Sequence, residues 1–178
     1  MLVLSNYFQG QPIPLLSDIA RRRKLSWFIA PIPKDAAVLE IGSGSGWVGA
    51  HLRANGWTRY TGLDVVPPAD VVGDIREWRK LGLQPASFDV IIAFEVVEHV
   101  DCFAECFDLL KPGGRLLLTS PVPHMDWVMK ILEAMGLNQK RTSPHDHLVY
   151  FDRVAWKGER ELRTVGFLAQ WGVFTKTS

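Results

Sequence analysis

A short apolar run that ends in a glycine-rich turn constrains this chain more than any other stretch. Residues 38–46 read VLEIGSGSG, and their apolar start suits a strand buried in a parallel sheet. Val48 and Leu52 then recur at helical spacing. Strand, glycine turn and helix in this order are typical of an α/β domain that binds a nucleotide. A tight turn without a ligand has the same glycines, so this stretch alone leaves both interpretations open.

An acidic residue farther along the chain favours the nucleotide. Asp64 ends the apolar run of residues 60–63, eighteen residues after Gly46. In such folds an acid near that distance accepts hydrogen bonds from the two hydroxyls of a ribose. The two oxygens of a carboxylate suit a vicinal diol. Together the turn and the acid predict a site for a nucleoside-containing cofactor.

Four stretches resemble class I S-adenosylmethionine-dependent methyltransferases, of the group that includes the ubiquinone and menaquinone methyltransferases. They read VLEIGSGSG, GLDVV, SFDVIIAFEVVEHV and LLKPGGRLLLTSP, and they run from Val38 to Pro121. The resemblance implies an α/β, Rossmann-like three-layer sandwich with a central, mainly parallel sheet. It also implies S-adenosyl-L-methionine as cofactor, with S-adenosyl-L-homocysteine as product, and methyl transfer to a small-molecule acceptor.

The resemblance also implies which residues bind the cofactor. They lie in the first strand, in the glycine turn after it, and at the ends of the second, third and fourth strands: Glu40, Gly42, Ser43, Gly44, Gly46, Asp64, Val65, Asp74, Ile75, Phe94 and Glu95. Asp74 and Ile75 fall where the family places an acid and an apolar residue against the adenine ring. An exocyclic amine needs an acceptor, and a ring face needs apolar cover. A helix N-cap is the alternative role for Asp74.

Length and composition indicate one soluble domain of ordinary type. The chain has 178 residues, 47% hydrophobic and 22% charged, with a formal net charge of +1. We therefore expect no nucleic-acid partner, and no segment reaches the ~18 apolar residues of a membrane span. Cys102 and Cys106 are interpreted as reduced thiols of a cytoplasmic protein. His145 and His147 lack a third ligand nearby, so we expect no metal. The oligomeric state is left open.

The single domain, residues 1–178, divides into four parts. Residues 1–37 are an N-terminal helix and cap, and residues 38–121 are the cofactor-binding core. Residues 122–150 are a lid-like insertion that chooses the substrate, since long insertions are commonly lids or binding loops. Residues 151–178 are a C-terminal helix and strand.

Two further expectations concern the edges of the sheet. Between Asp64 and the third strand at residues 70–73, five residues leave no room for a helix, so a reduced edge is expected there. At the other end, residues 151–167 resemble the family's next helix, and the last strand is residues 168–174. Relatives usually have one strand more, so we expect the sheet to end early.

Catalysis requires little from the protein besides alignment of the reactants and exclusion of water. A general base is needed where the acceptor must lose a proton, and His124 and His147 lie near the two ends of the insertion from which acceptor contacts are expected. The basic run from Arg21 to Lys24 is either a solvated helix face or an anchor for an anionic substrate or a membrane surface.

Two other functions remain open. A nicotinamide-dependent oxidoreductase uses a similar fold, but here Trp47 stands where the dinucleotide pattern continues toward its last glycine. A non-catalytic methyltransferase-like subunit would also fit. The intact glycines and Asp64 argue against loss of the cofactor site, and they do not address turnover.

Overall fold

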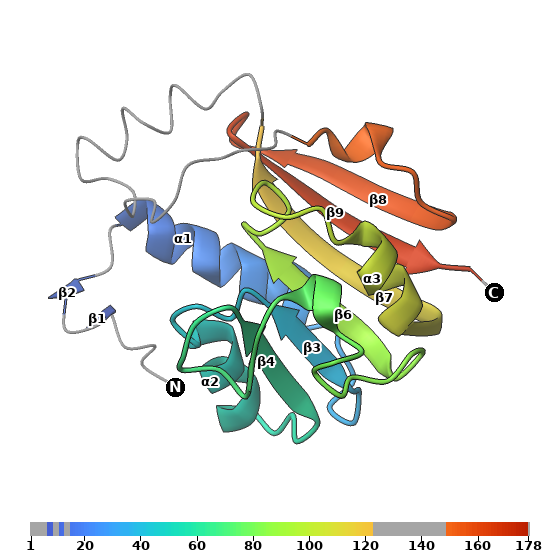
Figure 1. Cartoon of the computed structure of the whole chain (residues 1–178). Coiled ribbons are helices and arrows are strands. Elements are labelled where there is room, and N and C mark those ends of the chain that lie inside the picture. The colour runs from blue at the N-terminus through green and yellow to red at the C-terminus, as the bar shows by residue number, and fades with distance from the viewer. Residues whose placement is uncertain (1–6, 9–10, 13–14, 123–148, 178) are drawn as a thin grey trace.

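A seven-stranded sheet lies at the centre of the computed structural model, which describes residues 7–8, 11–12, 15–122 and 149–177. The strand order is β5-β4-β3-β6-β7-β9-β8 (Figure 1). Neighbours from β5 to β7 are parallel, and β9 is antiparallel to both β7 and β8. The strands are β3 Val38–Ile41, β4 Tyr60–Asp64, β5 Val71–Val72, β6 Phe88–Phe94, β7 Leu110–Pro121, β8 Gly158–Val165 and β9 Ala169–Lys176.

Helices cover both faces of this sheet. The helical elements are α1 Leu15–Lys24, the π-helix η1 Leu25–Ile29, α2 Trp47–Ala54, α3 Phe103–Leu109 and the 3₁₀ turns η2 Ile75–Glu77 and η4 Phe151–Arg153. Two short strands, β1 Tyr7–Phe8 and β2 Gln11–Pro12, pair separately. In the described part of the chain, no helix is both long and apolar enough to cross a membrane.

The described residues form two hydrophobic clusters, one on each face of the sheet, and these clusters explain why the elements form three layers. Successive side chains of a strand point to opposite faces. On β6, Val90 and Ile92 pack with Phe28 of η1 and Leu52 of α2. The alternate residues of β6 pack on the other face with Cys106 and Leu109 of α3 and with other buried side chains. The predicted three-layer sandwich with a mainly parallel sheet is therefore confirmed.

The local sequence accounts for α2. Gly46 caps its N-terminus in the left-handed conformation, and Val48 and Leu52 are buried as their spacing predicts. The helix ends at Ala54, and the side-chain amide of the C-cap residue Asn55 donates to the His51 carbonyl at 2.8 Å. Such a side chain satisfies one of the carbonyls that a helix end leaves unpaired. The helix therefore begins directly at the glycine turn.

The edge beside β4 has the reduced form that the sequence predicts. Strand β5 has two residues, and no helix lies in the connection that joins it to β4. Val65 and Val66 of this connection are 67% and 57% exposed. The part of the predicted site beside Asp64, where the nucleoside is expected, therefore lies next to a thin and partly apolar edge of the sheet.

At the opposite edge the prediction is wrong. Instead of a helix over residues 151–167, the structure has the short turn η4 and the eight-residue strand β8, so the sheet does not end early. Residues 159–163 include good helix formers, but pairing with β9 outweighs that preference. Gly166 and Phe167 both have φ near +59°, which gives the tight reversal that a hairpin needs.

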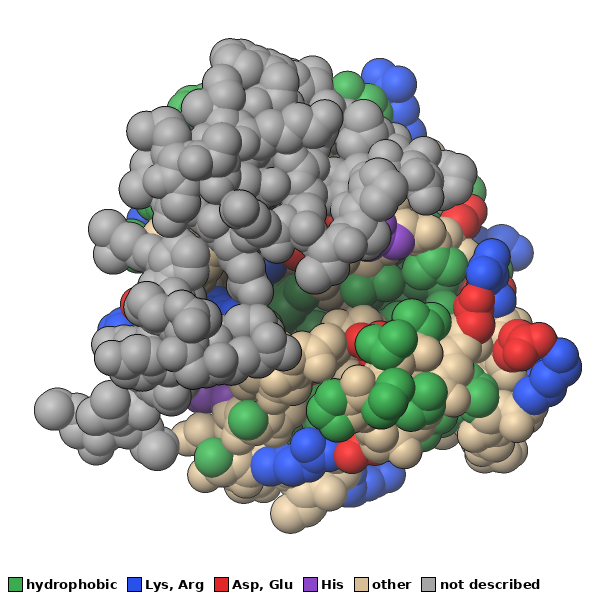
Figure 2. Space-filling model, turned by 60° about the vertical axis from the view of Figure 1, so that its left-hand side comes forward, with side chains coloured by type: hydrophobic (Ala, Val, Ile, Leu, Met, Phe, Trp, Pro, Cys, Tyr) green, Lys and Arg blue, Asp and Glu red, His purple; other side chains and the backbone are tan. Residues whose placement is uncertain are grey.

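Charged side chains of both signs occur on the described surface. Figure 2 shows basic and acidic side chains beside one another on the face turned to the viewer. Ion pairs such as Arg22–Asp18 at 2.9 Å and Arg53–Asp70 at 2.6 Å account for part of this pattern. The described surface thus matches the near-neutral net charge.

Candidate functional site

The parallel register brings the predicted cofactor residues to one edge of the sheet. Strands β5, β4, β3 and β6 are consecutive parallel neighbours, so their carboxyl ends face the same way. The glycine turn follows β3, Asp64 ends β4, Asp74 follows β5, and Phe94 ends β6. Ligands of open α/β sheets bind beyond such carboxyl ends. This edge is therefore the candidate site.

Hydrogen bonds hold the glycine turn against β4. The amides of Gly42 and Ser43 donate to the Leu63 carbonyl at 2.8 and 3.1 Å. The Gly44 amide donates to Asp64 Oδ2 at 2.7 Å. The acid predicted to bind a ribose thus also fixes the shape of the turn, which the sequence did not indicate.

Gly42 and Gly44 of the turn are glycines for different reasons. Gly42, Gly44 and Gly46 all have positive φ, at 70°, 46° and 70°. A Cβ on Gly42 would lie 2.6 Å from Cγ2 of Val96, so a larger residue there would have to displace the Val96 side chain. Among the described residues, a Cβ on Gly44 would meet only the Gly42 carbonyl oxygen, at 3.8 Å. Gly44 therefore leaves room above the turn that a ligand can enter.

Asp64 and Val65 lie beside that space. Asp64 Oδ1 accepts from the Val66 amide at 3.2 Å, so each of its oxygens already holds one backbone amide. A carboxylate has about four lone-pair sites, so acceptor capacity remains for hydroxyl donors. The exposed side chain of Val65 follows directly.

Asp74 has the alternative role that the sequence left open. Its carboxylate caps η2 by accepting from the Arg76 amide at 2.9 Å, and the Arg76 guanidinium pairs with it. These hydrogen bonds lower the pKa of Asp74. Ile75 is 2% exposed and packs in the core. Contact of either side chain with an adenine ring remains a prediction.

Glu40 lies beneath the site and is 3% exposed. Its Oε2 accepts a hydrogen bond from the Tyr60 hydroxyl. Burial raises the pKa of Glu40 to about 8, while the Tyr60 hydrogen bond opposes that rise. Burial, followed by the Glu40 carboxyl, also raises the pKa of Tyr60. Glu40 therefore supports β3 and β4 from inside, and its predicted contact with the cofactor remains untested.

Residues from distant parts of the chain meet at the end of β6. Glu95 adopts a left-handed conformation with φ of 57°, which is costly for a residue with a side chain. Its Oε1 accepts from the Thr119 hydroxyl at 2.7 Å and from Lys24 Nζ at 2.9 Å. The centroids of the Phe94 and Trp47 rings are 6.4 Å apart, and Lys24 Nζ lies 5.1 Å from the centroid of the Phe94 ring. Lys24, the last residue of α1, thus connects this helix to the candidate site.

Sequence reasoning did not identify the place of Lys24. The basic run from Arg21 to Lys24 predicts a solvated helix face or an anchor for an anionic substrate or a membrane surface, and the structure separates its members into mostly buried and exposed positions. The Lys24 side chain is 12% exposed, whereas Arg22 is 59% exposed and pairs with Asp18 of its own helix. Helical spacing separates inward from outward positions in such a run, and that signal was available.

A second acid is buried behind Glu95. Glu98 is fully buried, and neither of its carboxyl oxygens forms a hydrogen bond with another described residue. Burial, followed by the nearby Glu95 carboxylate, raises the pKa of Glu98 to about 8, and the neighbouring Ser120 hydroxyl opposes the rise. At neutral pH both Glu40 and Glu98 are therefore mainly uncharged.

The predicted catalytic residues His124 and His147 lie outside the described residues, as does most of the insertion at residues 122–150. Their role as bases stays a prediction. Among the residues described, no group of three His, Cys, Asp or Glu side chains is arranged to hold a metal ion. Cys102 and Cys106 are both free and buried.

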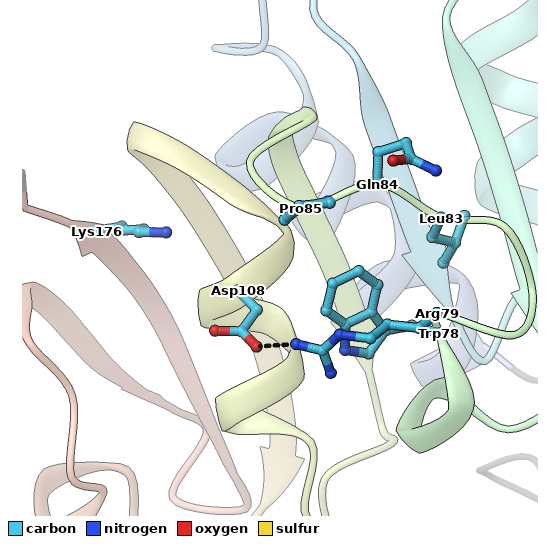
Figure 3. Close-up of a pocket in the computed structure, with 7 residues that line it drawn as sticks. All are labelled: Trp78, Arg79, Leu83, Gln84, Pro85, Asp108 and Lys176. Carbon is cyan, nitrogen blue, oxygen red and sulfur yellow. Dashed lines mark hydrogen bonds and ion pairs between the residues drawn. The ribbon is translucent and has the colours of Figure 1, made fainter.

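Two pockets of the described structure include neither the glycine turn nor Asp64. One of about 460 Å³ is bordered by the connection after η2, the end of α3 and Lys176, and the Arg79–Asp108 ion pair crosses it (Figure 3). These residues flank the starts of β6 and β7, so the pocket lies at the amino ends of these strands and on the side of the sheet opposite the candidate site. A groove of about 960 Å³ runs along α3 and contains neither the glycine turn nor Asp64. The site above is therefore assigned from its residues.

Comparison with known proteins agrees with this geometry. A family model described as a methyltransferase domain matches residues 16–167. A probable S-adenosylmethionine-dependent methyltransferase of Mycolicibacterium smegmatis is 37% identical over 100 residues, which cover 47% of this chain and 37% of that protein. A ubiquinone biosynthesis O-methyltransferase of Xylella fastidiosa (strain M23) is 33% identical over 103 residues, 48% of this chain and 42% of that protein. The matches thus span less than half the length of these relatives.

A solved structure supports the fold. Phosphoethanolamine N-methyltransferase 2 of Haemonchus contortus, in complex with S-adenosyl-L-methionine, superimposes with a TM-score of 0.61 at 14% sequence identity. The superposition covers 98% of this chain and 55% of the other. At this identity the likeness concerns the arrangement of the sheet and helices.

Proposed function

Because the chain belongs to the class I S-adenosylmethionine-dependent methyltransferase family, we propose that it transfers a methyl group from S-adenosyl-L-methionine to a small-molecule acceptor. The observation that carries this proposal is the joined pair of glycine turn and Asp64. The Gly44 amide and the Asp64 carboxylate are 2.7 Å apart at the carboxyl edge of adjacent parallel strands.

The residues present fit the cofactor. The described residues leave room for a ligand close to the backbone of Gly44, and Asp64 retains acceptor sites for ribose hydroxyls. Phe94 and Trp47 place aromatic surface at the end of β6. Lys24 is a cation at the same place, where it holds Glu95 in position. These groups would bind the nucleoside and orient the amino-acid end of the cofactor.

The chemistry requires alignment more than acid or base groups from the core. Bound S-adenosyl-L-methionine supplies a methyl group on a positively charged sulfonium, so the enzyme needs no covalent nucleophile. The described residues hold the donor in one orientation, which lowers the entropy cost of the reaction. A base assists acceptors that must lose a proton, and His124 or His147 is the proposed source. Small-molecule acceptors and a cytoplasmic location are part of this proposal.

Calorimetric titration tests the proposal. S-adenosyl-L-homocysteine should bind the wild-type chain, and a nicotinamide dinucleotide should not. Asp64→Ala should weaken S-adenosyl-L-homocysteine at least about tenfold, because hydrogen bonds to charged groups contribute ~1.5–3 kcal/mol each. Binding of the dinucleotide instead would favour an oxidoreductase.

Asp70→Ala is the matched control for this experiment. Asp70 Oδ2 also accepts from a backbone amide, that of Gly62, at 2.7 Å, but Asp70 lies in the connection that leads into β5 and its hydrogen bonds go to Gly62 and Arg53 instead of the glycine turn. Its loss should change stability and leave affinity within about threefold. Equal loss of S-adenosyl-L-homocysteine affinity in both variants would show that Asp64 affects binding by stabilising the fold and not by contact with the ligand. A screen of acceptors with labelled S-adenosyl-L-methionine then separates an enzyme from a non-catalytic subunit.

A further inference from the structure

Strand β8 forms one edge of the sheet, and within the described residues no strand pairs with its outer side (Figure 1). All eight residues pair with β9 in one continuous antiparallel register. Alternate residues of such a strand turn their N–H and C=O groups away from the neighbour. Proteins often interrupt a free edge with a proline or a bulge, and β8 has neither.

The side chains of β8 are exposed on both faces of the sheet. Glu161 and Arg163 share one face, with side chains 60% and 56% exposed and 3.1 Å apart. Arg160, Leu162 and Thr164 share the other face, and Leu162 is 39% exposed. Charges of both signs therefore occur on the strand, whereas a run of one sign would repel an identical strand.

We propose that β8 binds a second copy of this chain, through antiparallel pairing of the two β8 strands about a twofold axis at Leu162. An axis perpendicular to the sheet keeps each face continuous, so it must pass midway between the two copies of one residue. In this register Glu161 of each copy lies opposite Arg163 of the other. The two Leu162 side chains meet on the opposite face, so the pairing buries apolar surface as well.

The sequence selects this register over its neighbours. An axis at Glu159, Arg160, Glu161 or Arg163 places like charges opposite one another, which is destabilising. An axis at Thr164 pairs no opposite charges and overlaps less of the strand. Phe167, which is 82% exposed, lies in the hairpin turn just beyond the paired residues of β8.

Sedimentation velocity on the full 178-residue chain tests the proposal, over about 5 to about 500 µM because a single strand pair is a small interface. A dimer should appear as concentration rises. Glu161→Arg or Arg163→Glu should each weaken it at least about tenfold, because each change replaces two opposite-charge pairs by two like-charge pairs. The double variant, which exchanges the two charges, should recover wild-type association to within about threefold.

Glu159→Arg is the matched control, because Glu159 lies on the same face opposite Val165 and should change association less than about twofold. Leu162→Lys places like charges at the axis and serves as a second disrupting variant. Thermal unfolding verifies that each variant is folded. A wild-type chain that stays monomeric at the highest concentration overturns the proposal. So do single variants without effect, and so does a double variant that associates no better than the single ones.

Discussion

Replacement of Glu40 by glutamine should change how the stability of this protein depends on pH. The pKa of Glu40 rises from 4.5 in an exposed chain to about 8 in the folded protein, with burial as the main cause. Between these two values the unfolded chain loses the proton and the folded chain keeps it. The free energy of unfolding must therefore fall as pH rises through this window.

The magnitude follows from the linkage between protons and folding. One proton held by the folded state and not by the unfolded state corresponds to about 1.4 kcal/mol per pH unit. From pH 5.5 to pH 7.5, Glu40 should thus lower the free energy of unfolding by roughly 2–3 kcal/mol. Glu98 adds a similar slope, since its pKa is also about 8. Glutamine cannot ionise, yet its amide oxygen can accept the Tyr60 hydrogen bond.

Urea unfolding at pH 5.5, 6.5 and 7.5 measures this effect. The stability of Glu40→Gln relative to wild type should increase by about 1.4 kcal/mol for each pH unit. Tyr60→Phe is the control: it removes the hydroxyl that donates to Glu40 and keeps the buried carboxyl. Its stability should be lower while its pH slope remains. A constant difference between Glu40→Gln and wild type across the three pH values would refute the reasoning.

Three further predictions concern the candidate site. Gly44→Val should abolish S-adenosyl-L-homocysteine binding in calorimetry and lower the melting temperature, because the side chain fills the open space and strains a residue with φ of 46°; unchanged heats would mean that the turn binds nothing. Lys24→Gln should weaken the same ligand about three- to tenfold by releasing Glu95, whereas the exposed Arg22→Gln should leave it unchanged. At least one of His124→Ala and His147→Ala should lower turnover ~10²–10⁴-fold with cofactor affinity within about twofold; full turnover in both would assign these histidines no role as base.

The parts of this structure that local sequence determines were the parts that could be predicted. The order of strand, glycine turn and helix, and the acid that ends the next strand, depend on neighbouring residues and were recognised. The short connection before β5 followed from chain length alone. The wrong helix at residues 151–167 shows the limit, because helix formers such as Glu161 and Arg163 take strand geometry when a partner strand is present.

Contacts between distant residues could not be predicted in the same way. Lys24 and Glu95 lie 71 positions apart and meet because α1 packs across the end of β6. The reach of Tyr60 to Glu40 likewise depends on the register of β3 and β4. A single sequence contains no signal for such pairs. The identity of glycines and acids at the site was therefore easier to infer than the network that supports them.

The antiparallel hairpin of β8 and β9 has a consequence for the order of folding events. Its paired residues are four positions apart at the turn, Val165 with Ala169, and 18 apart at the far end, Gly158 with Lys176. Hairpins of this kind form in about 1–10 μs, whereas pairings between distant segments must first close long loops. Strand β9 pairs with β7 over separations of 48 positions or more, as for Pro121 with Ala169. The strands encoded last in this sequence are therefore among the first that can pair, and their docking onto β7 belongs to the slower phase.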